Sequence, residues 1–185
     1  AARGGRHVTI AQDQHSFERL AGVRDALWLM LGSSIEHSMV EHACGRFGQS
    51  LGRVPMPRSL TADKSGGLTT AQSRIVYVCT LPALNLTMVS VQENGLTSRG
   101  FTRTVGGTVA HLVALEHVLV TVGWLGRSPT FVTLAGMEWD FRAWEKQSAT
   151  ANELPRVSVH LARYVDAILA RWSSTTRALL LRTMY

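Results

Sequence analysis

The stretch SRGFTRTVGG contains the residue types that best fit chemistry at a phosphate. Arg99 and Arg103 flank Phe101, and Gly106 and Gly107 follow just before a long apolar run. The start of a helix carries unpaired N–H groups and a partial positive charge, which together favour anions. The chain has neither a P-loop lysine pattern nor a dinucleotide fingerprint. We therefore predict a site for backbone phosphates, without recognition of base sequence.

A second candidate is GQSLG, residues 48–52, which matches the G-x-S-x-G pattern of a nucleophilic serine, here Ser50. That pattern works only on a tight turn from a strand into a helix. We expect a helix before this stretch, and the proline-containing RVPMPR follows it. A glycine-ended helix C-terminus is therefore the expected structure, and a hydrolase is disfavoured.

The histidines do not form a convincing metal site. His37 and His42 lie five residues apart near Cys44, whereas a helical zinc site favours a spacing of four. His111 and His117 fall in an apolar stretch, where a hydrogen-bonded core histidine is the simpler interpretation. We predict no metal and no cofactor.

The carboxylates offer only one close pair, Glu138 and Asp140, which lie beside Trp139, Phe141 and Trp144. An acid and base pair is conceivable there, but a packed aromatic corner is expected because no pattern indicates a cleft. The sequence therefore predicts a protein that is not an enzyme.

The composition of the chain indicates which partners and which cellular settings fit these interpretations. The 185 residues carry a net charge of +6, and all but two of the 19 basic residues are arginines. Arginine bias fits nucleic-acid binding, and it equally fits a GC-rich genome. The two cysteines, Cys44 and Cys79, do not make a disulfide framework, which favours an intracellular, reducing setting. The arginine-rich start, AARGGR, also leaves open the remnant of a cleaved transit peptide.

The elements that would position these residues are mainly helical. Spacings of three and four residues between apolar positions predict helices at about 17–35, 34–51, 104–125 and 154–185. RIVYVCTL, residues 74–81, reads as a strand, and LNLTMVSV, residues 84–91, fits either a strand or a helix. The part from 109 to 125 is interrupted by His111, Glu116 and His117, so a buried helix is preferred over a membrane span.

The order of these motifs resembles the coat proteins of rod-shaped plant RNA viruses of the tobacco mosaic virus type. LGSSIEHSMVEHACGRFGQSL is similar to the second helix of that family, and RVPMPR to the link that follows it. VYVCTLPALNL resembles the segment that leads into the third helix, and TRTVGGTVA the start of the fourth. VLVTVGWLGRSPTF and AGMEW are similar to the end of that helix and the outer segment. The resemblance covers residues 6–139, with Gly106 and Gly107 where the family has acids.

The resemblance implies a mainly α fold: a four-helix bundle over residues 1–139, with a short extended segment. Residues 140–185 would add a C-terminal helix on the outer surface. The function implied is a structural capsid protein that self-assembles into a helical nucleocapsid around single-stranded RNA, in the virion and the host cytoplasm, without a membrane. The RNA-binding residues implied are Arg99, Arg103 and Phe101, with Arg46 and Arg58 as lesser candidates.

An alternative prediction is a non-catalytic accessory subunit of a large organellar, mitochondrial complex. It would explain the AARGGR start, the apolar helix from residue 109 to 125, and the lack of a catalytic set.

Overall fold

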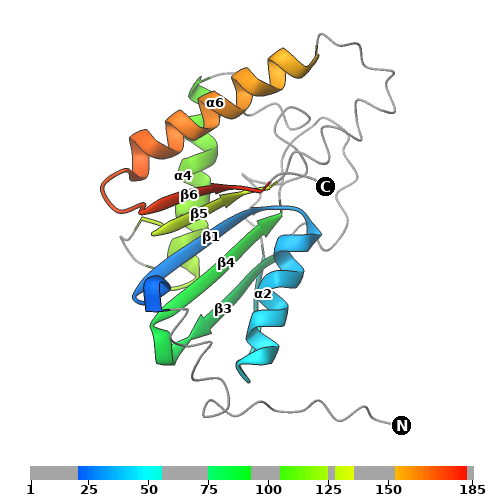
Figure 1. Cartoon of the computed structure of the whole chain (residues 1–185), viewed down its shortest axis with the longest axis vertical. Helices are drawn as coiled ribbons and strands as arrows, with labels where there is room; N and C mark the ends of the chain where they lie inside the picture. The colour runs from blue at the N-terminus through cyan, green and yellow to red at the C-terminus, as the bar shows by residue number, and fades with distance from the viewer. Residues whose placement is uncertain (1–20, 56–74, 93–104, 125–127, 136–152, 183–185) are drawn as a thin grey trace.

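The protein has an α/β fold built on one six-stranded sheet, as the computed structural model in Figure 1 shows. It describes residues 21–55, 75–92, 105–124, 128–135 and 153–182. The elements, in chain order, are η2 (Ala21–Val23), β1 (Ala26–Gly32), α2 (Ser34–Arg46), β2 (Gly52–Pro55), β3 (Ile75–Leu81), η4 (Pro82–Leu84), β4 (Leu86–Gln92), α4 (Val105–Thr121), β5 (Phe131–Leu134), α6 (Glu153–Trp172) and β6 (Ala178–Leu181). The predicted mainly α four-helix bundle is therefore wrong.

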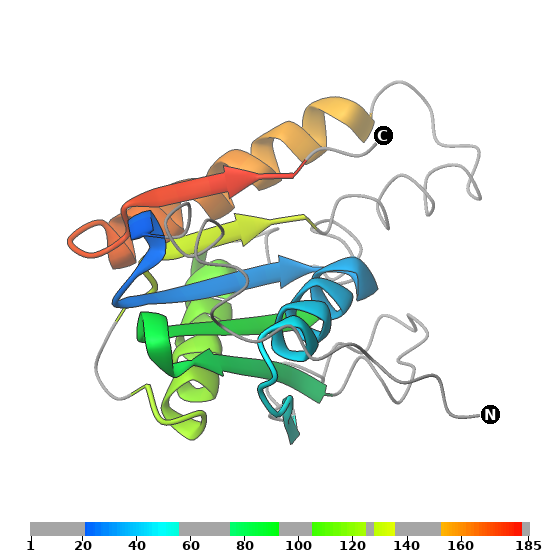
Figure 2. The same cartoon turned by 60° about the horizontal axis from the view of Figure 1, so that its bottom comes forward.

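The strands lie in the order β2-β3-β4-β1-β5-β6. Strands β4, β1, β5 and β6 run parallel to one another, and β3 and β2 add an antiparallel pair at one side (Figure 2). Strand β1 lies between β4 and β5, so it is flanked by parallel neighbours on both sides. The carboxyl ends of four strands consequently meet at one edge of the sheet.

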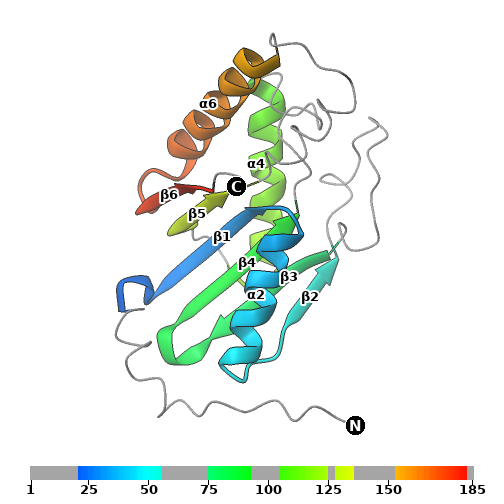
Figure 3. The same ribbon diagram turned by 45° about the vertical axis from the view of Figure 1, so that its right-hand side comes forward.

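Helices cover both faces of this sheet. Helix α2 lies over one face, against β3 and β4, and α4 and α6 lie on the other face (Figures 1 and 3). Two apolar cores result: Leu27, Leu29 and Leu31 of β1 pack in the core that contains α4 and α6. Ala26 and Met30 pack in the core that contains α2.

The burial of β1 on both faces explains why its sequence was misread as helical. Ala26, Leu27, Leu29, Met30 and Leu31 are all buried. A strand buried on both faces shows a continuous apolar run instead of alternation, and that run contains helical spacings by chance. The predicted helix over residues 17–35 is therefore wrong where the structure describes it, because β1 occupies Ala26–Gly32.

Several other predictions about elements are confirmed. Helix α2 and helix α4 fall within the predicted helices 34–51 and 104–125, and β3 matches the predicted strand. The stretch from 84 to 91, left open between two states, is a strand from Leu86 onward, where β4 begins. None of the helices in the described ranges is long and apolar enough to cross a membrane.

The C-terminal part differs from the single long helix that was predicted. Helix α6 ends at Trp172, and β6 then pairs with β5 in the same sheet. Trp172 is buried and donates its indole N–H to Glu116 of α4 at 2.9 Å, and Arg171 pairs with the same carboxylate at 2.5 Å. The division of the chain at residue 139 stays a prediction, but α6 and β6 belong to the same layered core as the preceding strands.

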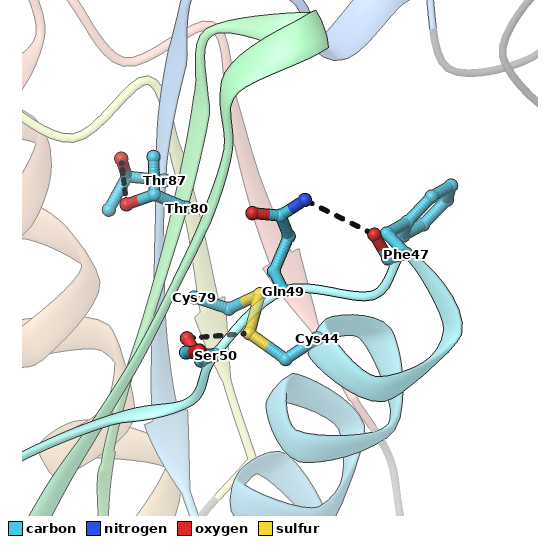
Figure 4. The surroundings of a disulfide bond; sticks show 7 residues. All are labelled: Cys44, Phe47, Gln49, Ser50, Cys79, Thr80 and Thr87. Carbon is cyan, nitrogen blue, oxygen red and sulfur yellow. Dashed lines mark hydrogen bonds between the residues drawn. A yellow bond between two sulfur atoms is a disulfide. The ribbon is translucent and has the colours of Figure 1, made fainter. Parts of the chain in front are cut away.

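A disulfide joins Cys44 near the end of α2 to Cys79 of β3 (Figure 4). Both residues are buried, and their Cα atoms are 5.6 Å apart although 35 positions separate them in sequence. The bond fixes α2 to the sheet on the side opposite α4. It contradicts our expectation that the two cysteines make no disulfide framework, because the fold brings together two residues that the sequence keeps apart.

Candidate functional site at the carboxyl edge of the sheet

The edge where the parallel strands end is where open α/β sheets usually bind ligands. After β1 the chain enters α2 on one face, whereas after β4 it enters α4 on the other face and returns as β5. The neighbouring parallel strands β1 and β4 are thus followed by helices on opposite faces of the sheet (Figure 2). In open α/β sheets, ligands bind outside the carboxyl ends of strands at such a divergence.

Ser34 is our candidate for a functional side chain at this edge. It is the first residue of α2, two positions after Gly32 ends β1, and it is exposed. The G-x-S-x-G motif also holds its nucleophilic serine where a strand leads into a helix, but on a strained turn, whereas the described non-glycine residues with positive φ are Asp25 and Asn85. The start of α2 also carries the partial positive charge of the helix dipole, which stabilises negative charge on an oxygen placed there.

The turn that carries Ser34 is fixed by a capping box. Ser33 is the N-cap of α2, and its side-chain oxygen accepts from the N–H of Ile35 at 3.3 Å. Glu36 reaches back and accepts from the Ser33 N–H at 2.7 Å. The two residues satisfy backbone donors that the helix start would otherwise leave unpaired. A Cβ at Gly32 would collide with the Glu36 carboxylate, so this close approach requires glycine.

The Glu36 carboxylate also connects this turn to the far end of the chain. Glu36 is 0% exposed, and Arg182 donates its Nε–H to Glu36 Oε1 at 2.6 Å. Arg182 directly follows β6, and its backbone N–H bonds to the Leu134 carbonyl at 3.0 Å. Among the described side chains, Arg182 also has a buried Nη2 with no hydrogen-bond partner. The ion pair therefore holds the ends of β1, β5 and β6 in one arrangement.

His37, next to this turn, is a structural histidine. Its Nε2 lies 2.9 Å from the carbonyl of Ile75, which can only accept, so Nε2 carries the proton. Its Nδ1 then accepts from the Ser90 hydroxyl at 2.6 Å. The ring stacks on Tyr77 with centroids 4.3 Å apart. Burial lowers the pKa of His37, which keeps the imidazole neutral, and both nitrogens are used in holding α2 to β3 and β4.

The residues predicted to bind RNA are not brought together within the described ranges. Arg99, Phe101, Arg103 and Arg58 lie outside the described residues. Arg46 is the last residue of α2, at the opposite end of that helix from Ser34. The predicted RNA site therefore stays a prediction.

The other candidates from the sequence have structural explanations or lie outside the description. Ser50 lies between α2 and β2, so it follows a helix and precedes a strand, as expected for a non-catalytic turn. His42 is exposed, and Cys44 is in the disulfide. Glu138 and Asp140 lie outside the described residues. The described ranges contain no group of three His, Cys, Asp or Glu side chains that could hold a metal ion.

Ser34 was missed by our sequence analysis, although the chain carries a signal for it. The run ALWLMLG is followed by SSIE, in which Ser33 and Glu36 have the spacing of a capping box. Recognising the run as a buried strand would have indicated a strand-to-helix turn at residues 32–34. Comparisons with protein families, with curated proteins and with solved structures gave no match for this chain.

Proposed function

We propose that this protein is a hydrolase of esters in which Ser34 is the nucleophile. The observation that carries the proposal is the position of Ser34: an exposed serine on the turn between a buried central strand and a helix. The exposed serine Ser38, one helical turn further along α2, has no comparable position at the strand end. The proposal replaces our prediction of a non-enzyme.

The chemistry proposed is acyl transfer to the serine oxygen. Ser34 Oγ would attack the ester carbonyl, forming an Oγ–acyl bond while the bond to the leaving alcohol breaks. The alcohol takes up the proton that Oγ gives up, and water then releases the acid and restores the serine. The positive end of α2 would stabilise the negative charge that develops on the carbonyl oxygen.

Rigidity of the turn supports the same proposal. A nucleophile must be held within a fraction of an ångström of its productive position. The Ser33 and Glu36 capping box, together with Arg182, gives this turn fixed contacts on both sides. An ordinary helix start needs a cap, but not a partly buried ion pair with a residue 146 positions away.

The coat-protein and accessory-subunit predictions receive no support from this geometry. The coat-protein prediction depended on a helical bundle, and the chain forms a mixed sheet instead. The accessory-subunit prediction depended on the lack of a catalytic set, and Ser34 now offers a nucleophile. Binding to RNA, assembly into a polymer and location in a virion stay predictions.

The experiment is labelling of the full chain with a biotin-linked alkyl fluorophosphonate, which forms a phosphorus–oxygen bond with an activated serine and releases fluoride. We expect covalent labelling at Ser34 in the wild type and none there in Ser34→Ala. Ser38→Ala is the matched control, because Ser38 is an exposed serine on the same helix, and it should label like the wild type. Wild-type protein that does not label, or a Ser34→Ala variant that labels equally, would overturn the proposal.

A further inference from the structure

The turn between β3 and β4 contains an acceptor sequence for N-glycosylation. Asn85, Leu86 and Thr87 form the pattern N-x-[ST], in which the middle residue is not proline. The pattern alone is common, so the structural setting of Asn85 decides whether the residue can carry a glycan. Asn85 is exposed and ends the short helix η4 in a left-handed conformation, with φ 47° and ψ 40°. Its side chain therefore lies at the tip of a tight surface turn.

This turn is at the edge of the sheet opposite Ser34. Leu86 begins β4 and pairs with Ala26 at the start of β1, whereas Ser34 follows the other end of β1. Seven paired residues separate the two edges, which corresponds to roughly 20 Å along the strands. A glycan on Asn85 would thus leave the carboxyl edge open.

The surroundings of Asn85 leave room for such a group. Asn85 Nδ2 donates to Asp25 Oδ1 at 2.9 Å in an exposed contact. Glycosylation replaces one of the two amide hydrogens, so one N–H remains. The backbone of the turn is held independently, since Asp25 N–H bonds to the Leu84 carbonyl and Ala26 N–H to the Asn85 carbonyl.

The disulfide supplies a second, independent observation. Disulfides persist in secreted proteins and in the lumen of the endoplasmic reticulum, and they are rare where glutathione keeps thiols reduced. The bond between Cys44 and Cys79 is buried and joins two separate elements of the core. N-glycosylation takes place in that same oxidising compartment. A chain with both features fits passage through it better than the cytoplasmic setting that the sequence had favoured.

We propose that Asn85 is an N-glycosylation site, modified before the chain has folded. The donor is an oligosaccharide linked to a lipid pyrophosphate. A bond forms between Nδ2 and the anomeric carbon, the bond from that carbon to the pyrophosphate oxygen breaks, and Nδ2 gives up one proton as the lipid pyrophosphate leaves.

The order of events follows from Thr87. In the fold Thr87 is only 7% exposed, and its hydroxyl lies 3.2 Å from that of Thr80 on the paired strand (Figure 4). An enzyme that must recognise this hydroxyl can reach it only while the β3–β4 hairpin is open. Asn85 itself stays exposed afterwards, so the finished fold accommodates the glycan. This proposal does not rest on the hydrolase function.

The test is expression of the full chain behind a cleavable secretory signal in eukaryotic cells, followed by digestion with peptide N-glycosidase F and denaturing electrophoresis. We expect one glycan, removed by the enzyme, with conversion of Asn85 to aspartate visible by peptide mass analysis. Asn85→Gln and Thr87→Val should abolish the shift, and Thr87→Ser, which preserves the acceptor sequence, should retain it. Because the glycan is added before folding and read on denatured chains, a misfolded variant still gives an answer. A wild type that does not shift, or an Asn85→Gln variant that shifts, would overturn the proposal.

Discussion

Helix α2 has a glycine- and serine-containing turn at each end. The two turns differ in the elements that they join and in the contacts that hold them. At the start of the helix, Gly32 ends the buried parallel strand β1 and Ser34 is the first residue of α2. After its end, Gly48 and Ser50 lie between the helix and the edge strand β2. Only the second turn matches the G-x-S-x-G pattern, and only the first has the strand-to-helix geometry that this pattern requires.

The two turns are also anchored by different means. The first is held by the Ser33–Glu36 capping box and the Glu36–Arg182 ion pair. The second follows a Cys44 that is tied to β3 by the disulfide, with Gln49 donating to the Phe47 carbonyl at 3.2 Å (Figure 4). If Ser34 acts as we propose, the position of a serine relative to the sheet, and not the sequence pattern around it, decides whether it can be a nucleophile. The following experiments test this difference.

The largest difference should appear in activity. Ser34→Ala should lower the hydrolysis of p-nitrophenyl acetate by about 1,000-fold, as expected when a nucleophile is removed. Ser50→Ala should leave the rate unchanged, because Ser50 lies on a helix-to-strand turn. The rates are measured side by side on proteins with matching circular dichroism spectra. Equal losses in the two variants would remove the proposed distinction between the turns.

Removing the disulfide should lower the free energy of unfolding more than it lowers the reactivity of Ser34. The double variant Cys44→Ser and Cys79→Ser opens a loop of 35 positions, which should lower the free energy of unfolding by about 4 kcal/mol. Urea titration of the variant measures the loss, and the wild type treated with dithiothreitol provides the matched comparison. Below the unfolding transition, Ser34 should still react with the fluorophosphonate, because the other end of α2 keeps its own anchors. A variant as stable as the oxidised protein would contradict this.

Replacing Glu36, the buried carboxylate at the start of α2, should have the next largest effect on stability. Glu36→Gln leaves Arg182 without its anion, and we expect a loss of about 2 kcal/mol, since the Arg182 side chain retains 30% exposure and water compensates part of the charge. Labelling of Ser34 should also slow as the turn loosens. Glu41→Gln on the same helix is the control, because its contact with Arg53 is long, at 3.6 Å, and exposed. Similar losses in the two variants would show that Glu36 has no special role.

The smallest effect concerns the dependence of stability on pH. Burial lowers the pKa of His37 below its ordinary value of 6.5, although Glu36 and Glu41 oppose this shift. Below pH 6.5 the unfolded chain therefore takes up a proton that the folded chain does not, so the free energy of unfolding decreases as the pH falls toward the folded pKa.

Thermal unfolding between pH 7.5 and pH 5 measures this slope. His37→Gln should reduce the slope while also lowering the overall stability through the lost contacts with Ser90 and Ile75. His42→Gln, which removes an exposed histidine from the same helix, is the matched control. A His37→Gln variant with an unchanged slope would assign the pH dependence to other groups.

Apolar periodicity in the sequence predicts an element correctly where one of its faces is buried. It fails where both faces are buried. Helices α2 and α4 and strand β3 were recovered from periodicity and β-branched residues. Strand β1 was lost because its two buried faces remove the alternation that identifies a strand. Strand β6 was not predicted because Ala178–Leu181 is too short to show any period and follows a real helix after only a short turn. With β1 misread, the turn at Ser34 could not be recognised.

The sequence by itself determined the capping box at Ser33 and Glu36, the acceptor pattern at Asn85 and the apolar content that fills two cores, because these depend on neighbours along the chain. Only the tertiary structure decided that β1 is central, that Cys44 meets Cys79 and that Arg182 reaches Glu36. Those contacts join residues separated by 35 to 146 positions. Their partners are chosen by how strands pair and helices pack over the sheet, and no local pattern of residues records that choice.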